Sequence, residues 1–164
     1  MTSSTGIGYD CHAFADGRKL VLGGVEISGE RGLAGHSDAD VLTHAVIDAL
    51  FGAAALGDIG EHFPDTDERF RNADSLELLR AAVRMLGAHG FEVRHVDATV
   101  IIERPKLAGF REQMRRALAD ALGVVVTSVS VKATRGEGMG FVGRGEGAAA
   151  LAVATVERVR AEGG

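Results

Sequence analysis

The sequence predicts an α/β (α+β) fold in which helices cover one face of a mixed sheet. Three observations predict it. Stretches with helical periodicity alternate with short β-branched runs, the 164 residues fit one domain, and neither an internal repeat nor a linker interrupts them. We therefore expect a single domain over residues 1–164.

The first elements are expected to be strands. Gly6–His12 mixes apolar and polar residues and predicts an opening strand. Lys19–Ile27 (KLVLGGVEI) predicts a second strand, paired with the first. Ser28–His36 is punctuated by glycine, which is typical of a loop.

A long helix is expected next. Apolar residues recur at helical spacing over Ser37–Leu56, with Ser37 or Asp38 as the N-cap and Gly57 as the stop signal. Asp58–Asn72 has no sustained period and contains a proline, so we expect a loop there.

A second helix and a buried strand follow. Asp74 opens a sequence (DSLE) that resembles a capping box, and the helix it predicts is closed by Gly90. Phe91–Arg104 contains the apolar run Ala98–Ile102, which is typical of a buried strand, and Pro105 ends it.

The last third is expected to hold one more helix and one or two strands. Leu107–Leu122 predicts an amphipathic helix that stops at Gly123, and Ser128–Thr134 alternates as a strand does. Gly147–Glu162 fits both a helix and a strand, and its periodicity does not decide between them.

Composition and charge exclude several classes of function. Lys and Arg number 18 against 23 Asp and Glu, a net charge of −5, which argues against non-specific nucleic-acid binding and a polybasic membrane anchor. No apolar run has membrane-spanning length, and Met1–Gly8 is too short and uncharged for a signal or transit peptide. The single cysteine, Cys11, excludes an internal disulfide and suits a reducing compartment such as the cytoplasm.

Histidine and aspartate spacing indicates a metal site. Asp10 and His12 share one face of the expected strand, although this pair alone is explained as well by a polar strand end. Asp40, His44 and Asp48 fall on one stripe of the expected helix. If this stripe is buried, its polar side chains need partners, because burying an unpaired polar group costs free energy. The alternative is that the stripe faces solvent.

One aspartate and two histidines from these clusters would give three protein ligands and one open position, the pattern of catalytic zinc. Asp38 or Asp40 could orient a ligating imidazole from behind.

The 23 glycines are about twice the usual share, and many lie in Gly136–Gly147 (GEGMGFVGRGEG). This segment contains a formal GxGxxG, but too little chain follows for a dinucleotide-binding unit. The glycines are better explained by tight turns or close backbone approach. Glu137 within them is a candidate ligand for a hard cation.

Six motifs together resemble one family over essentially the whole chain, in order and with matching spacing. The family is 2-C-methyl-D-erythritol 2,4-cyclodiphosphate synthase, of the non-mevalonate isoprenoid pathway. The motifs are Gly8–His12 (GYDCH), His36–His44 (HSDADVLTH), Gly57–Asp67 (GDIGEHFPDTD), Arg104–Lys106 (RPK), Val131–Thr134 (VKAT) and Gly140–Gly147 (GFVGRGEG).

The resemblance implies a lyase that converts 4-diphosphocytidyl-2-C-methyl-D-erythritol 2-phosphate into the cyclic diphosphate and CMP. It implies a homotrimer with active sites at subunit interfaces, and a strand after Gly147. Phe141, Arg144 and Glu146 would lie near the threefold axis, where the family has a cavity that can hold an isoprenoid diphosphate.

The resemblance also assigns roles to residues. It implies one zinc ion held by Asp10, His12 and His44, and a second divalent cation, Mg²⁺ or Mn²⁺, at Glu137. It implies that His36, Arg135 and Glu137 are catalytic. The substrate-binding residues that it implies are Asp10, Cys11, His12, His36, Ser37, Asp58, Ile59, Gly60, Phe63, Pro64, Asp65, Thr66, Asp67, Ile102, Glu103, Arg104, Pro105, Lys106, Leu107, Ala108, Ala133, Thr134, Arg135, Gly136, Phe141 and Arg144.

Two positions depart from the family's pattern. Ala39 replaces a common glycine, which we interpret as a helix-favouring change. Arg135-Gly136 replaces a hydroxyl-bearing pair, one member of which has a catalytic role in the family. From the residues alone, a metal-dependent phosphohydrolase and a non-catalytic nucleotide-binding module remain as alternatives.

Overall fold

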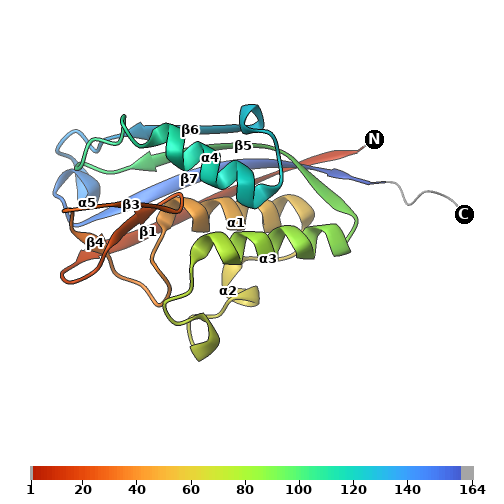
Figure 1. The fold of residues 1–164 in the computed structure, drawn as a ribbon, viewed down its shortest axis with the longest axis horizontal. Coiled ribbons are helices and arrows are strands. Elements are labelled where there is room, and N and C mark those ends of the chain that lie inside the picture. The colour runs from red at the N-terminus through yellow and green to blue at the C-terminus, as the bar shows by residue number, and fades with distance from the viewer. Residues whose placement is uncertain (1, 160–164) are drawn as a thin grey trace, which may run out of the picture.

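The computed structural model describes residues 2–159, which form a five-stranded mixed sheet with helices packed on it (Figure 1). The strand order is β4-β1-β7-β5-β6, and only β5 and β6 run parallel to each other. The strands are β1 (Ser3–Ala15), β4 (Gly32–Leu33), β5 (Phe91–Ile101), β6 (Val129–Thr134) and β7 (Gly147–Arg158). The predicted α/β fold with a mixed sheet is therefore confirmed.

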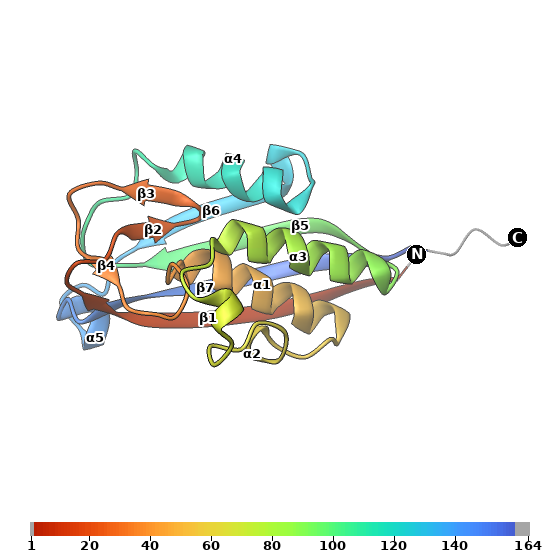
Figure 2. The same ribbon diagram turned by 60° about the horizontal axis from the view of Figure 1, so that its bottom comes forward.

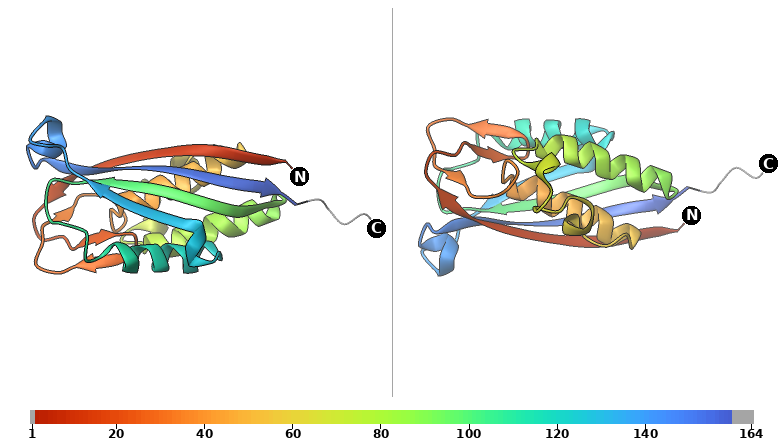
Figure 3. Two further views of the ribbon diagram at one scale, coloured as in Figure 1. Left: turned by 90° about the horizontal axis from the view of Figure 1, so that it is seen from above. Right: turned by 90° about the horizontal axis from the view of Figure 1, so that it is seen from below.

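Three long helices lie on one face of this sheet. They are α1 (Val41–Ala54), α3 (Ser75–Ala88) and α4 (Arg111–Leu122). Seen from above, the strands lie in front of α1 and α3, and from below these helices lie in front (Figure 3). The other face of the sheet carries exposed apolar side chains, including Ile7 and Tyr9. Among residues 2–159, no helix is long and apolar enough to cross a membrane.

Helix α1 packs unusually close to the sheet. Gly6 and Gly8 of β1 face it, and a Cβ added at either would overlap the backbone of Ala49 or Ala45. On the neighbouring strand β7 the helix-facing residues are alanines. With α3 covering its other side, twelve of the fourteen residues of α1 are buried (Figure 2). Two of the surplus glycines thus bring α1 down onto the strand that carries Asp10 and His12.

Several predicted helix ends and strands are confirmed. Asp74 caps α3 by accepting a hydrogen bond from the Leu76 N–H at 2.9 Å. Gly123 ends α4 in the left-handed conformation. Gly147–Arg158 is a strand, as the family resemblance implies, and the last residues of the expected tail, 160–162, lie outside the described residues.

The second predicted strand is wrong. Lys19–Ile27 folds into a hairpin of β2 (Leu20–Leu22) and β3 (Val25–Ile27), which pair with each other and not with β1. The Gly23-Gly24 turn between them has positive φ at both residues, and their N–H groups donate to the carboxylate of Asp40 at 2.9 and 2.7 Å. Two adjacent glycines inside an apolar run were the signal for this turn.

Helix α1 starts later than predicted, and its N-cap is Asp40 instead of Ser37 or Asp38. Asp40 Oδ1 accepts a hydrogen bond from the Thr43 N–H at 3.0 Å. Ala39 precedes this cap with φ of +57°, a left-handed conformation that an alanine adopts at a cost. Ala39 is therefore not a helix-favouring change, because it lies outside the helix in a conformation that favours glycine. The helix ends at Ala54, before Gly57.

Other boundaries also differ. The expected loop Asp58–Asn72 contains α2 (Ile59–His62) and a 3₁₀ turn (Glu68–Phe70), which are too short to show a period in the sequence. Helix α4 begins at Arg111, four residues later than Leu107. The four-residue helix α5 (Gly140–Gly143) lies at the end of the sheet where β7 begins, opposite the end where β1 begins (Figure 1).

Candidate active site

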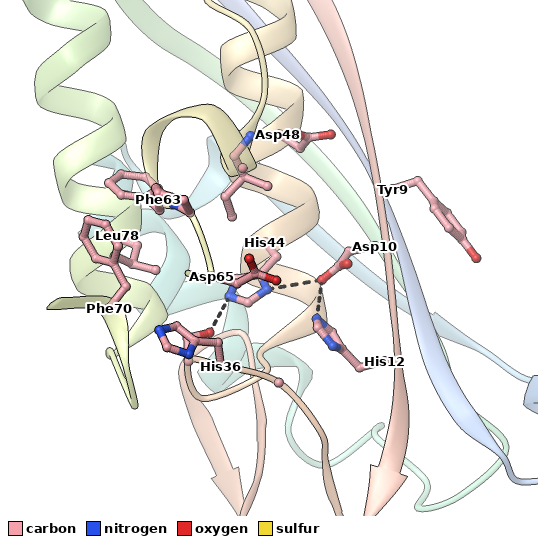
Figure 4. A pocket seen from close by; sticks show the side chains of 15 residues that line it. Tyr9, Asp10, His12, His36, His44, Asp48, Phe63, Asp65, Phe70 and Leu78 are labelled. Carbon is pink, nitrogen blue, oxygen red and sulfur yellow. Dashed lines mark hydrogen bonds and ion pairs between the residues drawn. The ribbon is translucent and has the colours of Figure 1, made fainter. Parts of the chain in front are cut away.

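Asp10, His12 and His44 converge on one point between β1 and α1 (Figure 4). Asp10 and His12 point to the same side of β1, and His44 lies in the first turn of α1 above them. Asp10 Oδ2 is 2.9 Å from His12 Nε2 and 3.2 Å from His44 Nδ1. One ligand atom from each of the three residues lies within 4.8 Å of the others, so the predicted triad is confirmed as a potential metal site.

The donor set fits a divalent metal ion. His12 Nε2 is buried and has no partner in hydrogen-bond geometry, so its ring nitrogen is available as a ligand. Burial works to raise the pKa of Asp10, but the two histidines outweigh it and lower this pKa to about 2. The carboxylate is therefore ionised. One carboxylate oxygen with two imidazole nitrogens is a ligand set typical of catalytic zinc.

A polar network lies behind His44. Its Nε2 is 2.7 Å from Ser75 Oγ and 3.2 Å from Ser37 Oγ. Ser75 in turn bonds to Asp38 through both its hydroxyl and its N–H. Of the two carboxylates expected to support an imidazole, Asp38 does so through Ser75. Asp40 instead holds the β2–β3 turn and the start of α1.

A cavity of about 510 Å³ opens beside the triad. His36, Ser37 and the α2 segment line it, and His36 Nε2 donates a hydrogen bond to the Asp67 carbonyl at 2.9 Å. The predicted site residues that line it are Asp10, His12, His36, Ser37, His44, Ile59, Gly60, Phe63, Pro64 and Asp65. Cys11, Asp58, Thr66 and Asp67 are not among the lining residues, and Cys11 lies on the opposite face of β1 from Asp10.

Sequence reasoning assigned no role in this site to Ser75, Leu78, Phe70 or Asp48. The sequence placed Asp48 only on the same helix stripe as Asp40 and His44. Its Oδ1 accepts the Ile59 N–H at 3.0 Å, and this hydrogen bond fixes the start of α2 at the cavity. Ser75 reads only as the first residue of a helix, 31 positions from His44, and no local pattern could have found it.

The other predicted residues gather around the ends of β5 and β6. A cavity of about 280 Å³ is lined by Ile102, Pro105, Lys106, Leu107, Ala108, Arg111, Ala133, Thr134 and Arg135. A second, wider one of about 1000 Å³ adds Glu103, Arg104 and Arg144. Glu103 joins the two segments by accepting the Gly136 N–H at 2.8 Å. Neither cavity shares a lining residue with the one beside the triad.

Glu137 is exposed and belongs to none of these three cavities. Its φ is +54°, and the nearest charged group is the Arg135 guanidinium, 3.7 Å away. The surrounding glycines allow close backbone packing, because a Cβ at Gly136 would overlap Gly143 and one at Gly143 would overlap Gly138. Phe141 is partly exposed, and Arg144 pairs with Glu146 at 2.9 Å.

Comparisons with known proteins agree with this geometry. A model of the YgbB family matches residues 3–157. The 2-C-methyl-D-erythritol 2,4-cyclodiphosphate synthase of Rubrobacter xylanophilus is 64% identical over 156 residues, which cover 93% of this chain and 94% of that protein. The bifunctional IspDF of Campylobacter jejuni matches with a TM-score of 0.92 and 44% identity, over 96% of this chain and 42% of that one. IspF of Plasmodium falciparum in its CDP complex matches with a TM-score of 0.83 and 27% identity, over 96% of this chain and 97% of that one.

Proposed function

The chain belongs to the YgbB family, and we propose that it converts 4-diphosphocytidyl-2-C-methyl-D-erythritol 2-phosphate into 2-C-methyl-D-erythritol 2,4-cyclodiphosphate and CMP. The observation that carries this proposal is the convergence of Asp10, His12 and His44 beside a cavity in a chain 64% identical to a synthase of that name.

The reaction needs no protein nucleophile. An oxygen of the substrate's 2-phosphate bonds to the β-phosphorus, the bond from that phosphorus to the oxygen shared with the α-phosphorus breaks, and CMP leaves with that oxygen and the bonding electrons. The 2-phosphate is already ionised at neutral pH, so the difficulty is to bring two anions together. Positioning and local neutralisation of charge must therefore supply most of the rate.

Asp10, His12 and His44 would hold one zinc ion in the wall of the 510 Å³ cavity. Withdrawal of charge from the β-phosphate is the chemistry that this ion would supply when bound. Glu137 would hold the second divalent cation, Mg²⁺ or Mn²⁺, which would supply positive charge for the departing phosphate. We refer to the triad with Asp38, Asp40 and Ser75 as the metal half of the site.

The residues lining the cavity beside the triad would bind the methylerythritol part. Phe63 and Ile59 give it apolar walls, while Asp65 and Asp48 offer carboxylates for hydroxyl groups. His36, which is held in place by the Asp67 carbonyl, would act at the phosphates. Helix α1 begins at Val41 and not at Ser37 as expected, so the N–H groups of His36 and Ser37 are not helix-terminal donors to a phosphate.

Ile102–Ala108 and Ala133–Glu137, the nucleotide half of the site, would bind the cytidine diphosphate. The 280 Å³ cavity that these segments line includes the cationic residues Lys106, Arg111 and Arg135, which suit a diphosphate. Support comes from the CDP complex of the Plasmodium falciparum protein, which has the same fold. Arg135 would contribute its guanidinium, since the family's hydroxyl is missing there.

A homotrimer would join the two halves. The metal half and the nucleotide half line separate cavities within one chain. The uncovered sheet face exposes Ile7 (70%), Tyr9 (52%), Leu151 (40%) and Val153 (42%), and such a face is typical of an interface. Three head-to-tail contacts close a ring. Phe141, Arg144 and Glu146 would then line an axial cavity able to take an isoprenoid diphosphate.

Product analysis tests the proposed reaction. The protein is incubated with the diphosphocytidyl substrate, zinc and magnesium, and the phosphorus-containing products are identified by ³¹P NMR. Cyclic diphosphate and CMP in equal amounts are expected. Inorganic phosphate would instead indicate a phosphohydrolase, and bound but unchanged substrate a nucleotide-binding module. The free, exposed Cys11 suits the reducing cytoplasm, where we expect the enzyme to act.

A further inference from the structure

The imidazole of His44 is held by two residues that do not reach the metal position. Ser75 Oγ lies 2.7 Å from His44 Nε2, on the side of the ring opposite the Nδ1 atom that faces Asp10. Ser75 is fully buried, and a buried hydroxyl group needs a hydrogen-bond partner. Its own partner is Asp38, which contacts no ligand atom of the triad directly within hydrogen-bond distance.

The direction of each hydrogen bond in the series His44–Ser75–Asp38 can be deduced. Asp38 already accepts the Ser75 N–H on Oδ2 at 2.9 Å and the Asp40 N–H on Oδ1 at 3.1 Å. An ionised carboxylate only accepts, so the single proton of the Ser75 hydroxyl is donated to Asp38 Oδ1. Ser75 Oγ must then accept from His44, and the ring proton therefore sits on Nε2.

In the neutral imidazole, the form that binds a metal ion, this assignment leaves the lone pair of His44 on Nδ1, which faces Asp10 Oδ2 at 3.2 Å. Two acceptors that face each other at this distance repel, and a metal ion bound between them would remove that repulsion. The hydrogen-bond chain thus directs the ligand atom of His44 toward the point where His12 Nε2 and Asp10 Oδ2 also aim.

We infer that Ser75 and Asp38 form a positioning pair that fixes the tautomer and the orientation of His44 for metal binding. The inference rests on the proposed metal at Asp10, His12 and His44. Ser75 acts through His44 and touches neither metal nor substrate. In many metal sites a carboxylate bonds directly to the ring nitrogen that does not bind the metal and so fixes the orientation of the histidine. Here the Asp38 carboxylate does this through the Ser75 hydroxyl.

Thr43 offers a matched control for Ser75. Its buried hydroxyl also donates to an aspartate, the buried Asp40, at 2.7 Å, and Thr43 is the chain neighbour of His44, but its hydroxyl makes no hydrogen bond with the imidazole. Thr43→Ala and Ser75→Ala therefore remove the same kind of interaction from the same region of the core. Of these two variants, only Ser75→Ala removes a partner of His44, the nearer of the two hydroxyl groups at Nε2.

The test is the zinc dissociation constant of the parent, Ser75→Ala and Thr43→Ala, measured by competition with a chelating dye. Loss of such a supporting contact is expected to weaken zinc binding about 10- to 100-fold in Ser75→Ala, with no change in Thr43→Ala. Equal affinity in the parent and Ser75→Ala, or equal weakening in both variants, would overturn the inference. Failure of the parent itself to bind zinc would instead reject the proposed metal site.

A second measurement needs no variant, and so holds even if Ser75→Ala does not fold. Long-range ¹H–¹⁵N correlation spectra of the zinc-loaded parent report which ring nitrogen carries the proton. We expect the proton of His44 on Nε2 and the metal on Nδ1. A proton on Nδ1 would overturn the inference while leaving the zinc site itself intact.

Discussion

Asp40 and Glu137 are both acidic residues of the proposed site region, and their surroundings are opposite. Asp40 is fully buried and accepts four hydrogen bonds, from Gly23, Gly24 and both the N–H and the hydroxyl of Thr43. Glu137 is exposed, and its nearest charged group is 3.7 Å away. Asp40 thus finds all of these partners within one chain, whereas Glu137 in the nucleotide half stays exposed and is only loosely paired with Arg135.

The largest expected effect comes from breaking the metal half at its centre. His44→Ala removes one of three ligands, so zinc content after dialysis should fall to background. Turnover should fall on the order of 10³-fold or more, since the charge withdrawn by a metal is worth several kcal/mol. His89→Ala is the control, because His89 is exposed at the end of α3 and its imidazole bonds to the Met85 carbonyl. Full zinc content in His44→Ala would contradict the assignment.

The stability of the two halves should also differ. Asp40→Ala leaves buried donors without an acceptor, so the free energy of unfolding should fall by about 3 kcal/mol or more. Glu103→Ala removes the half-buried carboxylate that accepts the Gly136 N–H in the nucleotide half. There water can replace the lost acceptor, and the loss should stay below about 1 kcal/mol. Urea unfolding measures both, and equal losses would show that the nucleotide half is as tightly built as the metal half.

A smaller effect on activity, without an effect on stability, is expected at Glu137. Glu137→Gln should change the free energy of unfolding by less than about 0.5 kcal/mol, as is usual at the surface. Zinc content should be unchanged, while turnover falls by about 10- to 100-fold and loses its dependence on magnesium. Titration of activity with Mg²⁺ checks this, with the exposed Glu112→Gln as control. An unaltered magnesium response in Glu137→Gln would remove the second metal from this residue.

The sequence predicted the ligands of the metal half better than the residues that hold those ligands in place. Alternation placed Asp10 and His12 on one face of a strand, and helical spacing placed His44 on a polar stripe, but the family resemblance selected these three as one ligand set. Asp38 was expected to support an imidazole, but the intermediate Ser75 was not, because tertiary packing alone brings it to His44. The capping role of Asp40 was also missed, since the cap depends on the left-handed turn at Ala39.

The fold class was predicted correctly, and the errors lie where short elements depend on local hydrogen bonds. The Gly23-Gly24 turn divides what reads as one strand, and α2 is a single turn capped by Asp58. Neither has enough residues to show a period. The nucleotide half was identified by family resemblance alone, because its segments 102–108 and 133–137 become neighbours only through the parallel pairing of β5 and β6.

We propose that the metal half of one chain works with the nucleotide half of another. The most direct measurement mixes His12→Ala with Glu137→Gln, each of which has at most about a tenth of the parental activity, unfolds both together and refolds them. In random trimers about a quarter of the interfaces join an intact metal half to an intact nucleotide half, so about a quarter of the parental activity should return. If each chain carries its whole site, mixing restores no activity, and the shared-site account is wrong.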